Sequence, residues 1–188
     1  MKTVQWVPPP RVPSIFDETE QALQRSRLEL LQSCWYYGAV SWQESAMLLQ
    51  HTEDGTFLVR DSQDPRFMYS LSLQRSKEGP TSVRISFRDG KFSLDAEPAI
   101  RRLMPSFETI GALICHYGSE KNQRKAHSLK PAANIVIRRP LYKHPPSLAH
   151  SARLIINKTL KQQSLGQARQ LRLPPKLMEF LRSYTLSL

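Results

Sequence analysis

The segment 55–62, Gly-Thr-Phe-Leu-Val-Arg-Asp-Ser, constrains the fold of this chain more than any other stretch. Its residues 57–59 form a short apolar run beside turn-forming residues, which is typical of a buried β-strand. Arg60 continues that strand, and burying a guanidinium costs free energy unless an anion lies beside it. Because a guanidinium can donate two parallel hydrogen bonds to a phosphate, Arg60 predicts a phosphate-binding pocket at the strand end. The alternative is a surface arginine capped by Asp61.

A second motif, Trp-Tyr-Tyr-Gly at residues 35–38, precedes this segment. The two motifs, in this order and spacing, resemble the Src-homology-2 (SH2) domain, a phosphotyrosine-binding module. Residues 35–38 match its opening W-Y-x-G signature, and residues 57–62 match its F-L-V-R-[DE]-S core. The resemblance implies that Arg60 binds the phosphate of a phosphotyrosine.

The rest of the pattern predicts an α+β fold, a central antiparallel sheet with a helix on each face. An N-terminal helix is predicted over 14–32 and should pack onto the following domain. The segment 41–44, Ser-Trp-Gln-Glu, has the form of a capping box, so another helix should begin there. Apolar residues at helical spacing predict a helix over 107–117, with Ser106 as candidate N-cap. Besides 57–59, the predicted strands are 69–73, 83–87, 91–94 and 135–137.

Three polar side chains near Arg60 are candidates for the same pocket. Ser62 follows it by two residues, where a loop can present both a hydroxyl and a backbone N–H to the anion. Gln63 adds an amide donor. Ser70, on the next strand, points the same way if Leu71 packs in the core.

Arg84 is the fifth candidate. On the third predicted strand it alternates with Val83 and Ile85, which directs it to the face opposite the core. Many SH2 domains have an arginine at the second position of the first helix, but this chain has Trp42 there. The resemblance to a family branch with arginine at the Arg84 position implies that Arg84 compensates. A solvated arginine on the sheet is the alternative.

The C-terminal segment carries an apolar helical face. Pro175 then begins a final helix at a favoured first-turn position. Two short amphipathic helices bury little area, so we expect a partner, with folding back onto the main domain as the alternative. The residues of the first face, at i, i+4, i+7, i+8 and i+12, are Leu148, Ala152, Ile155, Ile156 and Leu160.

An SH2 domain followed by such a box resembles the suppressor of cytokine signalling (SOCS) family, in particular its cytokine-inducible SH2 protein branch. Residues 79–81, 83–85, 89–92 and 94–95 look like that branch, and residues 147–158 and 171–181 look like the two ends of the SOCS box. Residue pattern and resemblance together predict four segments: a flexible proline-rich leader at 1–13, an extended N-terminal helix at 14–33, an SH2 domain at 34–140 and a SOCS box at 141–188.

The resemblance also implies partners. In this family the box recruits elongin C and elongin B, then a cullin scaffold with its RING protein, and the assembly ubiquitinates what the SH2 domain holds. The expected cargo is the phosphotyrosines of activated cytokine receptors. The expected elongin-binding residues are Leu148, Ala152, Ile155 and Ile156, and the expected cullin-binding residues are Leu171, Leu173 and Pro174.

Two departures leave a second function open. The family pattern has a cysteine where this chain has Ala152, and a proline where it has Arg172. The smaller alanine should weaken elongin binding by about 1 kcal/mol. The chain is therefore either a substrate receptor of a ubiquitin ligase that dampens JAK-STAT signalling, or an adaptor that only masks phosphotyrosines.

Composition and motifs narrow the remaining classes of function. The net charge is +11, and most of the surplus is in residues 141–188, scattered among apolar residues. A solvated face or protein interface is favoured over nucleic acid. No nucleophile motif surrounds the Ser, His and Asp residues, so we expect no catalytic residues and no enzyme. His150 is expected to be exposed or at an interface.

The sequence indicates neither a cofactor nor a membrane location. Two cysteines, Cys34 and Cys115, give no metal spacing and no disulfide framework, so we expect no metal and a reducing cytoplasm. No apolar run of 18 residues exists, so membrane insertion is not expected.

Overall fold

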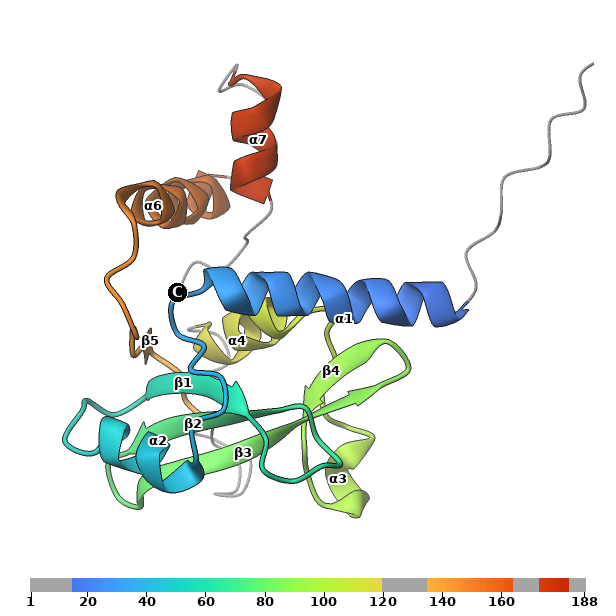
Figure 1. Ribbon diagram of the computed structural model, residues 1–188, viewed down its shortest axis with the longest axis vertical. Helices are drawn as coiled ribbons and strands as arrows, with labels where there is room; N and C mark the ends of the chain where they lie inside the picture. The colour runs from blue at the N-terminus through green and yellow to red at the C-terminus, as the bar shows by residue number, and fades with distance from the viewer. Residues whose placement is uncertain (1–14, 120–134, 164–172, 183–188) are drawn as a thin grey trace, which may run out of the picture.

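The computed structural model describes residues 15–119, 135–163 and 173–182 (Figure 1). Its centre is a five-stranded sheet with the strand order β4-β3-β2-β1-β5. Strands β1 to β4 pair antiparallel, and β5 pairs parallel to β1. The strands are β1 (Thr56–Asp61), β2 (Tyr69–Arg75), β3 (Gly79–Arg88), β4 (Lys91–Leu94) and β5 (Arg139–Pro140).

Helices cover both faces of this sheet. In Figure 1, α2 lies on one face, α4 and α1 lie on the other, and α6 and α7 lie beyond α1. This arrangement confirms the predicted α+β fold. The helices are α1 (Ile15–Gln32), α2 (Trp42–Leu49), α3 (Pro98–Arg101), α4 (Ile110–Gly118), α6 (Leu148–Gln163) and α7 (Pro175–Arg182).

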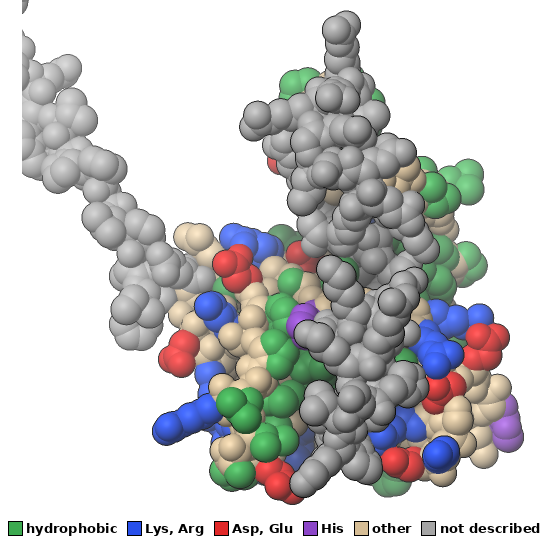
Figure 2. All heavy atoms as spheres, turned by 180° about the vertical axis from the view of Figure 1, so that it is seen from behind, with side chains coloured by type: hydrophobic (Ala, Val, Ile, Leu, Met, Phe, Trp, Pro, Cys, Tyr) green, Lys and Arg blue, Asp and Glu red, His purple; other side chains and the backbone are tan. Residues whose placement is uncertain are grey.

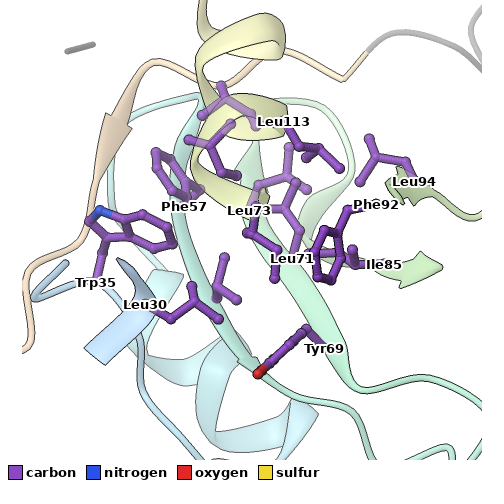
Figure 3. Close-up of a cluster of buried hydrophobic side chains, with 14 residues drawn as sticks. Leu30, Trp35, Phe57, Tyr69, Leu71, Leu73, Ile85, Phe92, Leu94 and Leu113 are labelled. Atoms are coloured by element: carbon purple, nitrogen blue, oxygen red, sulfur yellow. The ribbon is translucent and has the colours of Figure 1, made fainter. Parts of the chain in front are cut away.

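Strand alternation divides the core into two clusters. Phe57 and Val59 of β1 point toward α4 and join the larger cluster, shown in Figure 3. Leu58, between them, points the other way and packs against Leu49 of α2. Because side chains alternate along a strand, Arg60 shares the α2 face with Leu58. The fold therefore places the predicted phosphate ligand on the side of the sheet away from the larger core.

Helix α1 is fixed to the sheet domain through the start of α4. Leu30 of α1 is buried in the larger cluster. The Ser26 hydroxyl accepts a hydrogen bond from the backbone N of Ile110 at 3.3 Å, which satisfies a donor at the helix start. Burial raises the pKa of Glu29, which also faces this helix start. The helix predicted over 14–32 is thus confirmed, and it packs onto the following domain.

The strand predicted over 135–137 is wrong. Ile137 is fully buried, as a strand residue would be, but the chain pairs with β1 only from Arg139 onward. Just before that, the backbone N of Arg138 donates to the carbonyl of Gly55 at 2.8 Å. Gly55 has φ +81°, and a Cβ there would lie 2.7 Å from Cγ of Arg138. A side chain at position 55 would clash with Arg138, so this close approach requires a glycine.

The predicted start of the helix over 107–117 is also wrong. Its N-cap is Thr109, whose hydroxyl accepts from the backbone N of Ala112 at 3.1 Å, and not Ser106. Phe107 forms an antiparallel bridge with Phe92 instead, with its backbone N donating to the Phe92 carbonyl at 2.8 Å. The predicted leader 1–13 and most of the polar loop after α4 lie outside the described residues.

Candidate functional site

Strand register places three of the predicted residues in one row across the sheet. Arg60 of β1 lies opposite Ser70 of β2, and Ser70 lies opposite Arg84 of β3. Residues directly opposite in paired strands point to the same face. Leu71 of β2 is buried in the larger cluster, so Ser70 faces the α2 side. Period-two alternation was enough to predict this row.

The row lines a cavity of about 570 Å³, into which all five predicted residues project. Ser62 and Gln63 reach it from the loop after β1. Five further residues line the cavity and were not predicted as part of a phosphate site. These are Trp42, Asp64, Ser82, Val83 and Asp95.

Arg60 is held by neutral oxygens. It is 4% exposed, and its Nε donates to the Ser72 hydroxyl at 3.2 Å and its Nη1 to the Asp61 carbonyl at 3.0 Å. Its Nη2 lies 3.5 Å from the Ser82 hydroxyl. Burial lowers the pKa of Arg60, yet a guanidinium stays charged at neutral pH. Among the described residues no carboxylate pairs with it, so its charge is available to an anion.

Ser72 and Ser82, whose hydroxyls contact the Arg60 guanidinium, were not predicted from the sequence. Their hydroxyls lie 2.8 Å apart, and the Ser72 hydroxyl is 3.2 Å from that of Ser45 on α2. The signal was present, because Ser72 is in phase with Ser70 and lies opposite Ser82. This chain of hydroxyls fixes the orientation of the guanidinium before any ligand arrives.

The loop residues differ in part from expectation. The backbone N–H of Ser62 donates to the Met68 carbonyl at 3.0 Å, so it does not face an anion as expected. The Ser62 hydroxyl accepts from the backbone N of Asp64 at 3.1 Å and can still donate its own hydrogen. Gln63 Oε1 accepts from the backbone N of Trp42 at 3.2 Å, which leaves the amide nitrogen as a donor.

Arg84 lies at the cavity mouth with a carboxylate beside it. Its side chain is 52% exposed, and its Nε is 3.4 Å from Oδ2 of Asp64. Its guanidinium lies 5.4 Å from the centre of the Phe67 ring. Trp42, at the start of α2, is 55% exposed and lines the same cavity. The arrangement therefore combines one buried arginine, one exposed arginine and neutral donors around a space suited to a doubly charged anion.

The predicted elongin-binding residues form an exposed face on α6. Leu148 is 90% exposed, and Ile155, Ile156 and Ala152 are exposed as well. Figure 2 shows hydrophobic side chains at the edge of the molecule at the level of α6. Apolar side chains gathered on one helix face are typical of a protein interface.

The other side of α6 packs against α7, and the expectation for His150 is wrong. His150 is only 6% exposed, and its Nδ1 is 3.0 Å from Nη2 of Arg153. Arg153 lies over the Phe180 ring, 4.4 Å from its centre. Asn157 Nδ2 donates to the Leu181 carbonyl at 3.1 Å. The polar side of α6 thus fixes α7, while the apolar side stays exposed.

The predicted cullin-binding residues are only partly described. Leu173 and Pro174 directly precede α7, where Leu173 is half-buried and Pro174 exposed. Leu173 lines a hollow between α7 and α1. Leu171 lies outside the described residues.

Comparison with known proteins places both parts of the chain. Residues 35–117 match the SH2 domain model, and residues 144–182 match the SOCS box model. The rat protein named suppressor of cytokine signaling 2 is 32% identical over 173 residues, covering 89% of this chain and 84% of that protein. The chain belongs to the suppressor of cytokine signalling family.

Other family members agree with this placement. The chicken cytokine-inducible SH2-containing protein is 31% identical over 177 residues, covering 85% of this chain and 69% of that protein. Family membership close to these two proteins confirms the predicted branch. Among solved structures, the SH2 domain of a CRK/CRKL homologue from Monosiga brevicollis matches with TM-score 0.42 and 27% identity, covering 58% of this chain and 86% of that one.

Two features are absent from the described residues. Within them, no three His, Cys, Asp or Glu residues come together in a way that could hold a metal ion. No helix in the described ranges is long and apolar enough to cross a membrane.

Proposed function

We propose that this chain binds phosphotyrosine segments of activated cytokine receptors, or of proteins associated with them, and dampens JAK-STAT signalling in the cytoplasm. The observation that carries the proposal is the row Arg60, Ser70 and Arg84 at a cavity whose buried arginine has no carboxylate partner among the described residues. Family membership supports the same function, because its SH2 domain is a phosphotyrosine-binding module.

The contacts suggest how the phosphate binds. Arg60 donates to it bidentately, after its bond to Ser82, the longest of the three, gives way. The hydroxyls of Ser62 and Ser70 and the amide of Gln63 donate to the remaining oxygens. Arg84 closes the site from its exposed side.

We further propose that the box makes the chain a substrate receptor of a ubiquitin ligase, itself without catalytic residues. The exposed face of α6 supports this, since Leu148 is 90% exposed and packing against the described residues does not explain a leucine there. Elongin C, with elongin B, would cover Leu148, Ala152, Ile155 and Ile156. A cullin with its RING protein would then bind near Leu171, Leu173 and Pro174.

A second candidate function, masking phosphotyrosines without efficient ligase recruitment, is favoured by one observation. Ala152 lies within the exposed face and contributes only a methyl group, where the family pattern has a cysteine. The loss of contact weakens recruitment but leaves Leu148 and both isoleucines in place. We therefore rank this function second.

Two binding measurements test the proposals separately. Calorimetry with receptor-derived peptides should show binding of the phosphorylated form and none of the unphosphorylated form. Purified elongin B–C should elute with the chain in size-exclusion chromatography. Phosphopeptide binding without elongin binding would favour the masking function, and no binding of any phosphopeptide across a peptide array would overturn the first proposal.

A further inference from the structure

Asp64 brings a carboxylate into a cavity that, in the proposed function, receives another anion. It lines the cavity from the loop between β1 and β2, and its side chain is only 16% exposed. Its Oδ1 accepts from the backbone N and the Nε of Arg66 at 3.1 and 3.0 Å, and its Oδ2 accepts from Nη2 of Arg66 at 2.7 Å. The same Oδ2 lies 3.4 Å from Nε of Arg84.

This carboxylate is ionised whenever the protein functions. The hydrogen bonds from Arg66 are the main cause that lowers the pKa of Asp64 to about 2, and the charge of Arg84 acts in the same direction. A full negative charge therefore stands at the wall of the cavity near neutral pH.

The two arginines of the site differ in whether a carboxylate already pairs with them. Arg60 is buried and bonded to neutral oxygens, whereas Arg84 is half exposed and already paired with an anion. An incoming phosphate meets Arg60 without a competitor. It must share Arg84 with Asp64, or take Arg84 from it.

We propose that Asp64 is a resident counter-ion that competes with the phosphotyrosine phosphate for Arg84 and so limits the affinity of the cavity. The inference rests on the proposed phosphotyrosine function. It assigns to Asp64 a role in setting the affinity, acting through Arg84.

The distances make the exchange feasible. Asp64 keeps three hydrogen bonds to Arg66 if its single, longer contact with Arg84 is lost. Arg84 can therefore turn toward the phosphate while Arg66 retains the carboxylate. Phe67 lies within 6 Å of both guanidinium groups, 5.9 Å from that of Arg66 and 5.4 Å from that of Arg84.

The exchange also provides discrimination between anions. A peptide carboxylate gains little by replacing one carboxylate with another at Arg84. A phosphate dianion carries about twice the charge, with a second pKa near 6, and gains more from the same arginine. Asp64 therefore lowers the affinity for both kinds of anion, and the phosphate dianion keeps the larger gain from Arg84.

Calorimetry with one phosphotyrosine peptide on the full chain tests the inference through Asp64→Asn. Asparagine keeps an oxygen acceptor for the backbone N of Arg66 but removes the charge. We expect binding to tighten about three- to tenfold. Should the variant lower the Tm, the same comparison is made with Asp64→Ser, whose hydroxyl can accept the same N–H.

Two other aspartates are matched controls. Asp95 lines the same cavity but pairs with Arg101 at 3.4 Å, and Asp89 is exposed at the turn between β3 and β4. We expect Asp95→Asn to increase the logarithm of the affinity by less than half as much as Asp64→Asn does. Asp89→Asn should leave the affinity unchanged. An equal gain for Asp95→Asn would mean that only the net charge of the cavity matters, and would overturn the role of Asp64.

A double-mutant cycle with Arg84→Gln isolates the competition. If Asp64 acts through Arg84, the gain from Asp64→Asn disappears in the Arg84→Gln background. A gain that persists in full, or weaker binding in Asp64→Asn, would contradict the inference.

Arg60→Lys distinguishes failure of the role of Asp64 from failure of the proposed function. If Arg60→Lys abolishes binding while Asp64→Asn changes nothing, the inference fails and the phosphotyrosine function stands. If no phosphopeptide binds even the unmodified chain, the proposed function fails, and the inference fails with it.

Discussion

The sheet cavity and the exposed face of α6 are opposite kinds of surface. The cavity is polar, and its central residue, Arg60, is buried and oriented by hydroxyls before a ligand arrives. The α6 face is apolar, and its first residue, Leu148, is 90% exposed. The first surface is organised in advance for a charge, and the second gains its free energy only when a partner covers it.

Because of this difference, the two surfaces should lose binding through different kinds of change. Changes in charge or hydrogen-bond geometry should damage the cavity, and salt should weaken its binding. Changes in apolar area should damage the α6 face, with little dependence on salt.

Arg60→Lys should have the largest effect. Lysine keeps the charge but loses the bidentate geometry, so phosphopeptide affinity should fall about 100-fold or more. Calorimetry measures this, and circular dichroism should show an intact fold. The matched control is Arg88→Lys, an exposed arginine at the end of β3, which should bind as the unmodified chain does. Equal affinity for Arg60→Lys would remove Arg60 from the site.

Leu148→Asp should break the other surface and leave the first intact. A charge at the centre of an apolar interface should weaken elongin B–C binding at least about 30-fold. Because Leu148 is exposed, the Tm should not change. Leu103→Asp, another exposed leucine but in the SH2 region, is the control in the same pull-down. Elongin binding that survives Leu148→Asp would mean that a different face is used.

Ala152→Cys should strengthen elongin binding modestly. The larger side chain restores contact in the apolar face and should contribute about 1 kcal/mol, or about fivefold in Kd. Surface plasmon resonance with immobilised elongin B–C resolves such a change, with Ala99→Cys on α3 as control. No gain would indicate that position 152 lies outside the interface.

The α6–α7 contact should weaken in mild acid, the smallest effect. Burial, with help from the charge of Arg153, lowers the pKa of His150 below its ordinary 6.5. Below that pH the unfolded chain binds more protons than the folded chain, so the free energy of unfolding falls as the pH drops. Thermal unfolding between pH 8 and 5.5 measures this. His150→Asn should reduce the pH dependence, whereas His144→Asn, at an exposed histidine, should not.

The sequence predicted the residues whose direction follows from strand periodicity. Arg60, Ser70 and Arg84 are in phase with alternating strands, so no knowledge of loops was needed to place them on one face. Ser62 and Gln63 were placed near the site by their distance along the chain. The bond from the Ser62 N–H to Met68 depends on how the loop folds back, and no local pattern encodes it.

Features that depend on contacts between distant segments could not be predicted. Asp64 and Arg66 read as ordinary loop charges until β3 brings Arg84 beside them. His150 is buried beside Arg153, which packs on Phe180 of α7, and amphipathic spacing gives a face but not its neighbour. The strand expected at 135–137 failed for the same reason, since its partners lie far away in sequence, at Gly55 and at the start of β1.

In the proposed function, one chain connects a phosphotyrosine to elongin. A bead carrying a receptor-derived phosphotyrosine peptide, incubated with this chain and purified elongin B–C, tests it directly. Elongin should stay on the bead with the unmodified chain, and be lost with Arg60→Lys, with Leu148→Asp or with the unphosphorylated peptide. Retention of the chain without elongin, or of elongin in spite of Arg60→Lys, would contradict the account.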